Sequence, residues 1–380
     1  MQKILTDFLI LIRNYVSGYD VSFSLNDKEL EALGELAHFH NVDSLVLEAF
    51  KKNNLTISED FSRNAKRESY KSMVQEEELE VLKRRFIEEK IPFMPLKGAV
   101  ISKMYPKSYL RNRADIDILV KLDDFKKVKD ILIEEGYNFG VSGSNHDSYN
   151  KGALIKIEIH KSLIDEAIST HSFFSNVWDS DYIYNDGYEY FLKEEYFYMF
   201  LLSHSAKHFS NGGGAFRLLI DLYYYFNYLN NNGKKLDFDL INEKLEELGL
   251  AKFNKIVLES VDYLFNGKEE TEDILLFLDY ILKAGTYGTK QINSMIGIDQ
   301  EGSKGKHILK RLFPPLSIMK RRNPTLKKAP FLLPWFYFTR CIKGLFRFKA
   351  TKEELKSIDD AKKYDKERLN KIKDITGIGW

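Results

Sequence analysis

Two aspartates, separated by a single residue, lie in an apolar stretch and have the chemistry to bind a divalent cation. Asp115 and Asp117 alternate with Ile116 and Ile118. Side chains two residues apart on a strand share a face, so we expect the carboxylates side by side and the isoleucines packed on the opposite face. Adjacent buried carboxylates repel each other and lose hydration, so a strand rarely keeps such a pair unless a cation offsets the charge. Mg²⁺ is the natural ion, because it takes hard oxygen ligands and is often held by one or two carboxylates with substrate phosphates.

A third acid is expected on a later strand. Glu158 lies in the apolar, β-branched run from Ile155 to Ile159 and needs a partner for the same reason. Asp115, Asp117 and Glu158 are therefore the predicted metal ligands. The alternative for Glu158 is an edge strand, on which its carboxylate would face water.

The order of these residues along the chain resembles a known group of enzymes. The matching positions are Leu96-Lys97-Gly98, Arg111, Asp115 to Val120 and Glu158-Ile159-His160. They resemble the nucleotidyltransferase superfamily of the DNA polymerase β type. The finer resemblance is to an uncharacterised bacterial nucleotidyltransferase family, whose genes often lie beside polysaccharide or peptide-modification genes. The match is specific over about residues 90 to 225, and Arg113 departs from it, because the family usually has a small or apolar residue there.

The resemblance implies transfer of a nucleotidyl group from an NTP, with ATP as the expected donor, to a hydroxyl or phosphate acceptor. The acceptor is expected to be a small molecule, a glycan or a peptide. Asp115, Asp117 and Glu158 become the catalytic carboxylates, which hold Mg²⁺ (or Mn²⁺) against the triphosphate, and Glu158 would also accept the proton of the nucleophile. Backbone N–H groups of Gly98 would face the phosphates, while Lys97 and Arg111 would add positive charge. We expect Arg113 either to face solvent or to contact substrate.

Several further polar residues are candidates for the substrate cleft. His160 follows the third acid by two residues and is predicted either to support the metal site, to bind substrate or to be a packed, hydrogen-bonded histidine. The family resemblance includes a His-x-x-x-His pair, here His204 and His208, and a later Arg-x-x-x-Asp, here Arg217 and Asp221. His204, His208 and Arg217 also lie on either side of the glycine run 212 to 214, which permits close backbone approach, and we expect them to line the cleft. His204 and His208 are spaced to share a metal on one helix face, but no third zinc ligand is evident.

An i, i+4 ion pair between Arg217 and Asp221 explains those two residues without any function.

The hydrophobic pattern predicts an α+β protein with a small sheet region between helical regions, and the family resemblance implies that this region is a mixed-sheet nucleotidyltransferase core. A long charged segment without Gly or Pro, residues 63 to 90, predicts a helix with Met73, Leu79, Leu82 and Phe86 on its buried side. Strands are expected over residues 93 to 96, 116 to 120, 137 to 141 and 154 to 159, with a helix over residues 99 to 105 after Gly98 and a turn at 142 to 145. The expected domains are an N-terminal helical region (1–90), the nucleotidyltransferase core (91–190), a helical domain (191–300) and a basic aromatic C-terminal helical region (301–380).

Composition predicts a globular cytoplasmic protein. The chain of 380 residues is 44% hydrophobic and 30% charged, and its net charge is +1. Its one cysteine, Cys341, excludes an internal disulfide and suits a reducing cytosol. The first residues make a poor signal peptide, and no run reaches the roughly 18 apolar residues of a membrane-spanning helix.

Charge is concentrated near the C-terminus. Residues 302 to 350 contain 13 Lys or Arg and no Asp or Glu, together with clustered aromatic residues and prolines. Such a segment can pack on the core with solvated lysines, bind RNA by stacking, or contact an anionic membrane. We favour the membrane over RNA, because the aromatic residues cluster with proline instead of following a cationic strip. This predicts peripheral association with the inner face of the membrane.

Two alternative functions remain open. One is a transferase that modifies tRNA or protein, as toxin-like relatives of the superfamily do. The other is a non-catalytic adaptor that binds nucleotide, against which the presence of all three acids argues.

Overall fold

A computed structural model describes residues 2–346, except 167, 287 and 324, and residues 366–379. The strands are β1 (Phe93–Pro95), β2 (Ile116–Val120), β3 (Asn138–Ser142), β4 (His146–Lys151), β5 (Ile155–His160), β6 (Ile183–Asp186) and β7 (Glu189–Leu192). The helices before and within the sheet region are α1 (Lys3–Ser17), α2 (Asp27–Phe39), α3 (Asp43–Lys52), α4 (Glu59–Glu88), α5 (Gly98–Ile101), α6 (Phe125–Glu134) and α7 (His171–Phe174). Those that follow are α8 (Glu194–Ser210), α9 (Phe216–Asn231), α10 (Phe238–Glu247), α11 (Ala251–Phe265), α12 (Glu272–Ala284), α13 (Lys290–Glu301), α14 (Lys304–Leu312), α15 (Leu316–Arg322), α16 (Thr325–Lys328), α17 (Leu333–Phe346) and α19 (Lys366–Thr376).

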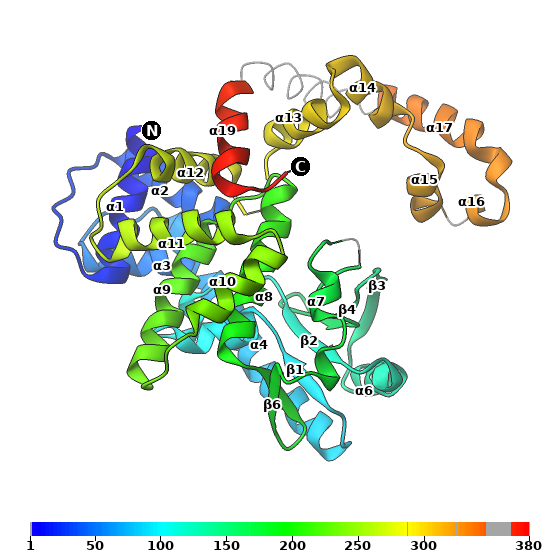
Figure 1. The fold of residues 1–380 in the computed structure, drawn as a ribbon, viewed down its shortest axis with the longest axis horizontal. Helices are drawn as coiled ribbons and strands as arrows, with labels where there is room; N and C mark the ends of the chain where they lie inside the picture. Colours follow the sequence, from blue (N-terminus) through cyan, green and yellow to red (C-terminus); the bar gives the residue numbers. More distant parts are fainter. Residues whose placement is uncertain (1, 167, 287, 324, 347–365, 380) are drawn as a thin grey trace.

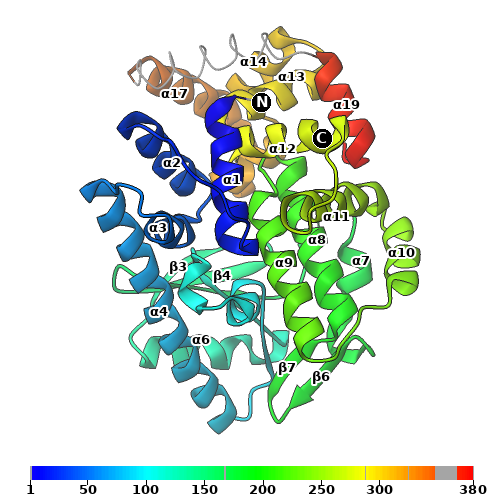
Figure 2. The ribbon, with the colours of Figure 1, turned by 90° about the vertical axis from the view of Figure 1, so that its left-hand side faces the viewer.

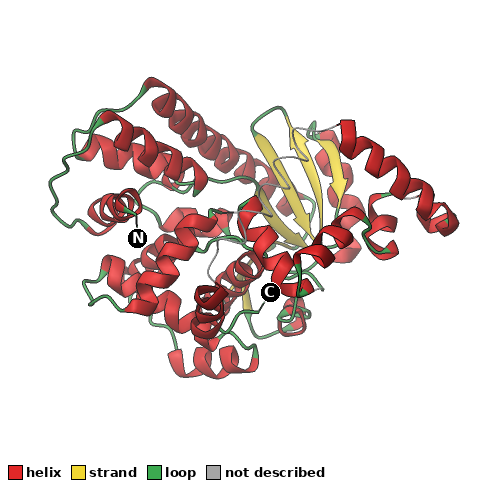
Figure 3. Ribbon diagram, turned by 90° about the horizontal axis from the view of Figure 1, so that it is seen from above, coloured by secondary structure: helices red, strands yellow, loops and turns green. Residues whose placement is uncertain are grey.

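The strands form one mixed sheet in the order β3-β4-β5-β2-β1-β7-β6. The central pair, β2 and β5, is parallel, and its register sets Asp117 opposite Glu158. Strand β1 pairs antiparallel with β2 and parallel with β7, while β3, β4 and β5 pair antiparallel. Figure 3 shows the strands gathered into a single sheet with helices on both sides. The α+β class expected from the sequence is confirmed.

The two faces of the sheet differ in chemistry, as the alternation of residues in β2 predicts. Ile116, Ile118 and Val120 point to one face, where they form a buried core with Ile157 and Ile159. Helices α4 and α6 cover this face with the apolar residues Leu79, Leu82, Phe86, Val128, Ile131 and Leu132. The opposite face therefore carries the acids.

The prediction that Met73 lies on the buried side of α4 is wrong. Met73 is 40% exposed, whereas Ser72 and Gln75 are buried. Ser72 Oγ accepts a hydrogen bond from the backbone N–H of Arg113, and Gln75 Nε2 donates one to the carbonyl of Leu154. The buried side of α4 thus continues through polar residues that form hydrogen bonds to the sheet region. At this point the buried side is rotated away from Met73, and the hydrophobic pattern alone does not reveal this.

The short elements depart most from the sequence pattern. Strand β4 and the β6–β7 hairpin were not predicted, because β4 is mostly polar and the hairpin strands have four residues each. The helix expected after Gly98 is a four-residue α5 followed by a 3-10 turn over Ser102–Met104.

The N-terminal helices and the helices after the sheet share one apolar core. That core joins side chains of α1, α2 and α3 to those of α8, α9, α11 and α12. Nε2 of His40 lies 3.0 Å from the carbonyl oxygen of Leu282, and the N–H of Thr286 donates to the carbonyl of Phe39. Figure 2 shows α1 beside α11, a contact between segments far apart in sequence. The division into four domains stays a prediction.

Helices α14 to α17 form an arm that extends away from the sheet and the helical body (Figure 1). They contain most of the predicted basic aromatic segment 302 to 350, of which residue 324 and residues 347–350 lie outside the described residues. No helix among those the structure describes is long and apolar enough to cross a membrane.

Candidate active site

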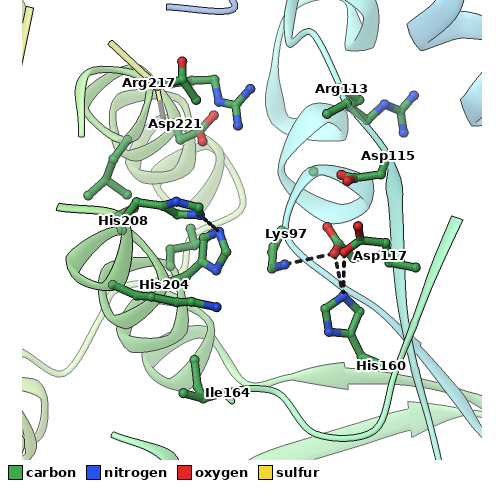
Figure 4. A pocket seen from close by; sticks show the side chains of 18 of the residues that line it. Lys97, Arg113, Asp115, Asp117, His160, Ile164, His204, His208, Arg217 and Asp221 are labelled. Atoms are coloured by element: carbon green, nitrogen blue, oxygen red, sulfur yellow. Dashed lines mark hydrogen bonds and ion pairs between the residues drawn. The ribbon is translucent and has the colours of Figure 1, made fainter. Parts of the chain in front are cut away.

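A cavity of about 600 Å³ lies between the acidic face of the sheet and helices α8 and α9. Strands β2 and β5 supply one wall, and α8 and α9 supply the other, as Figure 4 shows. All ten residues predicted for the site line this cavity: Lys97, Gly98, Arg111, Asp115, Asp117, Glu158, His160, His204, His208 and Arg217. Residues from four separate stretches of the chain therefore meet in one place.

The three predicted acids come together at this wall. Asp117 and Glu158 are paired residues on adjacent parallel strands, and Asp115 precedes β2 on the same side. Strand β5 lies between β4 and β2, so Glu158 is not on an edge strand. Nζ of Lys156 lies 3.3 Å from Oδ2 of Asp115 and 2.5 Å from Oε1 of Glu158, and so joins these two acids.

The two aspartates have opposite electrostatic environments. Oδ1 of Asp117 accepts from Nζ of Lys97 at 2.9 Å and lies 2.6 Å from Nε2 of His160. Burial alone would raise the pKa of Asp117, but Lys97 and His160 hold it well below its usual range. Burial and the charges of Asp117 and Glu158 raise the pKa of Asp115 to about 6. Surplus negative charge is thus concentrated at Asp115, as the chemistry of a cation site requires.

The turn that carries Lys97 is backbone-strained. Lys97 has φ 43° and ψ −111°, a region that side-chain-bearing residues seldom adopt. The strain lets Nζ of Lys97 reach Asp117 across the turn between β1 and α5. A Cβ on Gly98 would lie 2.7 Å from Nη1 of Arg111, so a side chain at this position would force the Arg111 guanidinium to move.

Arg111 lines the cavity in a buried ion pair. Its Nε donates to Oδ1 of Asp221 at 2.7 Å, and its Nη2 donates to Oδ2 at 2.9 Å. The hydroxyl of Tyr105 also donates to Oδ1 of Asp221. Both carboxylate oxygens of Asp221 are therefore engaged with Arg111, while Nη1 of Arg217 donates to the carbonyl of Asn112.

Arg113 is buried, which excludes the solvent-facing alternative. Its Nη2 donates to the carbonyl of Ser72 at 2.6 Å, and its side chain lines the cavity. Burial lowers the pKa of Arg113 to about 10, with the charge of Arg111 acting in the same direction and Glu76 against it. Within the described chain, Nε of Arg113 is buried without a hydrogen-bond partner.

Comparison with known proteins identifies the family of this chain. Residues 26–266 match the model of a family described as uncharacterised nucleotidyltransferase, which is more than half of the chain. The chain belongs to this nucleotidyltransferase family. No curated protein and no solved structure matches it. The family resemblance is confirmed, and nucleotidyl transfer is the general activity of the enzyme.

The helical wall of the nucleotidyltransferase carries two facing histidines. Nε2 of His204 and Nε2 of His208 are 3.0 Å apart on successive turns of α8. Burial lowers the pKa of His204 well below its ordinary value and that of His208 to about 4, so both imidazoles are neutral near pH 7. Among the described residues, neither belongs to a group of three or more possible metal ligands.

Two residues of the acidic wall were missed by the sequence analysis. Lys156 was detectable, because it precedes Glu158 by two residues and must share its strand face. Nε2 of His146 lies 3.5 Å from Oε2 of Glu158, and its strand, β4, carries too polar a pattern to be recognised.

Proposed function

We propose that this nucleotidyltransferase moves a nucleotidyl group from an NTP, with ATP as the donor, to a hydroxyl or phosphate on a small molecule, a glycan or a peptide. The observation that carries the proposal is the convergence of Asp115, Asp117 and Glu158 in one cavity. A cavity of about 600 Å³ is within the usual range for small-molecule sites. A glycan acceptor would suit a role in polysaccharide biosynthesis.

The donor set fits a hard divalent ion, Mg²⁺ or Mn²⁺. Three carboxylates from two adjacent strands supply oxygen ligands, and the raised pKa of Asp115 marks unbalanced negative charge there. Such an ion supplies charge neutralisation at the phosphoryl oxygens and makes the acceptor hydroxyl more acidic. Nζ of Lys156 must leave the pair of acids that it joins, and its long, partly exposed side chain allows this.

The side chains of this protein have separate roles in the proposed reaction. An acceptor oxygen forms a bond to the α-phosphorus, the bond from that phosphorus to the bridging oxygen breaks, and pyrophosphate leaves with the electron pair. The proton of a hydroxyl acceptor passes to Glu158. Lys97, Arg113 and Arg217 line the cavity as cations that can stabilise the phosphates. Arg111, fixed by Asp221, holds the wall beside Gly98 in position.

His204 and His208 lie on the wall opposite the acids and suit the acceptor side of the cleft (Figure 4). As neutral imidazoles they can accept or donate hydrogen bonds to hydroxyl groups without bringing charge. His160 supports Asp117 through the hydrogen bond between them.

The test is transfer from labelled NTPs with Mg²⁺ or Mn²⁺, read by pyrophosphate release and by mass spectrometry of candidate acceptors. The double variant Asp115→Asn/Asp117→Asn should abolish transfer and keep the native circular dichroism. Asp123→Asn, an exposed aspartate outside the cavity, is the matched control and should keep wild-type transfer. Undiminished transfer in the double variant would refute the site.

The same assay separates the alternative functions. Label appearing on tRNA or on protein, and not on small acceptors, would favour the toxin-like alternative. Nucleotide binding without transfer to any acceptor would favour a non-catalytic adaptor.

We further propose that the arm, residues 302 to 346, rests on an anionic membrane. Phe331, Trp335 and Phe338 are 78%, 61% and 57% exposed, and the arm has no acidic residue to oppose its Lys and Arg. Aromatic side chains favour the membrane–water interface, and each basic residue near an anionic surface adds about 1 kcal/mol. The enzyme would then act on its acceptor at the inner face of the membrane.

Sedimentation with vesicles of phosphatidylglycerol and phosphatidylcholine tests this. Binding should be strong at low salt, weak at high salt and lost in Trp335→Ser/Phe338→Ser. Leu122→Ser, an exposed apolar residue away from the arm, should bind as wild type does. Absence of binding at both salt concentrations would overturn the proposal. RNA that co-purifies with the wild-type protein and not with the same double variant would indicate RNA binding instead.

A further inference from the structure

Two histidines stand beside the acids on the same face of the sheet. The antiparallel register of β4 and β5 pairs His146 with His160, and the parallel register of β5 and β2 pairs Glu158 with Asp117. Glu158 and His160 are two residues apart on β5 and share its face. The fold therefore sets two imidazoles and two carboxylates side by side on three neighbouring strands.

The ligand atoms of this cluster are spaced as ligands of one ion are. Nε2 of His146 lies 3.5 Å and Nε2 of His160 lies 3.7 Å from the same oxygen, Oε2 of Glu158. Atoms bound to one ion at about 2.1 Å lie about 3.0 to 3.5 Å apart at angles near 90° to 110°. His146, Glu158 and His160 offer ligand atoms that all lie within 4.8 Å of one another.

We propose that His146, Glu158 and His160 form a mixed imidazole–carboxylate site that binds a first-row transition-metal ion, Mn²⁺ foremost, in preference to Mg²⁺. The inference rests on the proposed function, with which it shares Glu158, and identifies the ion that is selected there. Mg²⁺ requires hard oxygen ligands and near-octahedral geometry, whereas imidazole nitrogen is a good ligand for transition metals. Two nitrogens in the shell therefore shift selectivity away from Mg²⁺, while the Glu158 carboxylate keeps the site suited to Mn²⁺.

The surroundings of His160 support its use as a ligand. Its ring is buried, and Nδ1 lies 3.5 Å from Nδ2 of Asn145, whose Nδ2 also donates to the carbonyl of Ser162 and whose Oδ1 accepts from the Ser162 hydroxyl. Metal-binding histidines usually have their second ring nitrogen held by such an outer contact. Coordination through Nε2 requires the proton to sit on Nδ1, so the Asn145 amide must turn to present Oδ1 in place of Nδ2. Nε2 then gives up its hydrogen bond to Asp117 in exchange for the ion.

The experiment uses the full-length protein, stripped with a chelator and titrated with Mn²⁺ or Mg²⁺. Free Mn²⁺ is followed by electron paramagnetic resonance, and Mg²⁺ affinity is measured by competition. The Kd for Mn²⁺ should be at least tenfold lower than that for Mg²⁺. Pulsed resonance spectra of bound Mn²⁺ should show coupling to imidazole nitrogen.

Variants assign that nitrogen signal. His146→Gln and His160→Gln should each weaken the coupling and raise the Kd for Mn²⁺ about tenfold, with little change in the Kd for Mg²⁺. His204→Gln removes an imidazole from the opposite wall of the same cavity and should leave the Mn²⁺ spectrum unchanged. An oxygen-only spectrum, or equal affinities for the two ions, would overturn this inference while leaving the carboxylate site intact. Failure of the proposed function would look different: bound metal, with nitrogen coupling, but no transfer.

Discussion

At the scale of single residues, the site is governed by how each acid is paired. Asp117 contacts Lys97 and His160, so its charged form is favoured, whereas Asp115 has the charges of two other acids against it, which its ion pair with Lys156 offsets in part. The pKa values of two carboxylates only two positions apart in sequence are thus shifted in opposite directions. Such divergence is typical of sites in which one acid stays ionised while another exchanges a proton or a cation.

Removing Lys156 should raise the pKa of Asp115. Lys156 lowers that pKa, so Lys156→Met should move it above about 6. The measurement is a titration of the ¹³C-labelled aspartate carboxyl carbon by NMR, with Asp115→Asn used for assignment. Lys161→Met removes a cation that pairs with Asp147 and should not move the Asp115 titration. An unchanged or lower Asp115 pKa in Lys156→Met would contradict the placement of Lys156.

Breaking the Arg111–Asp221 pair should strongly destabilise the fold. Both partners are buried, and removing one leaves the other as an uncompensated charge, which costs about 3 to 5 kcal/mol. Asp221→Asn should lower the free energy of unfolding by about that amount in urea titrations. Lys244→Met, which breaks an exposed pair on α10, should change it by less than about 1 kcal/mol. Equal effects of the two variants would show that Arg111 is solvated.

At the scale of elements, the turn between β1 and α5 fixes how close Lys97 and Gly98 lie to the acids. Strand β1 lies beside β2, so Lys97 leaves the sheet next to Asp117. The strained backbone of Lys97 and the missing side chain of Gly98 let the turn pack against Arg111. The conformation of this turn therefore couples the acidic wall to the helical wall through Arg111 and Asp221.

Gly98→Ala should weaken the contact between the turn that carries Lys97 and the helical wall. Its Cβ would approach Nη1 of Arg111 to 2.7 Å, so the guanidinium must shift and its bonds to Asp221 weaken. We expect nucleotide affinity to fall about tenfold in calorimetric titrations, with a loss of stability of about 1 to 3 kcal/mol. Gly305→Ala on α14, where a Cβ meets no atom, is the control and should bind nucleotide as wild type does. Unchanged affinity in Gly98→Ala would show that the turn can relax.

At the scale of the whole molecule, the N-terminal helices are held to the C-terminal helices through buried contacts. His40 exemplifies this, since its ring is buried at the end of α2 and bonds to the carbonyl of Leu282 on α12. Burial lowers the pKa of His40 to about 4. His40 and Thr286 also line the cavity. The packing of the N-terminal helices against the C-terminal helices therefore also shapes the site.

Stability should fall as the pH drops from about 6.5 to 4. In this window the unfolded chain protonates His40 and the folded chain does not, so the unfolded state gains protons and is favoured. The two pKa values correspond to a contribution of up to about 3 kcal/mol. Thermal melts of His40→Gln, which keeps a donor for Leu282 without titrating, should show a shallower loss of Tm between pH 7 and pH 4.5. Identical slopes in the two proteins would mean that His40 titrates as it does in water.

The sequence by itself determined the chemistry of the site and the face on which it lies. Alternation over Asp115 to Ile118 separates acids from isoleucines, and this holds in any sheet because the strand repeat is two residues. The family resemblance, which the match over residues 26–266 confirms, also predicted that His204, His208 and Arg217 lie near the acids. Only the tertiary structure decided that Arg111 pairs with Asp221, that Lys156 joins Asp115 to Glu158, and that His146 stands beside Glu158. Each of these contacts depends on strand register or on helix packing between distant segments, and no local pattern of hydrophobicity or charge encodes which distant partner a side chain will meet.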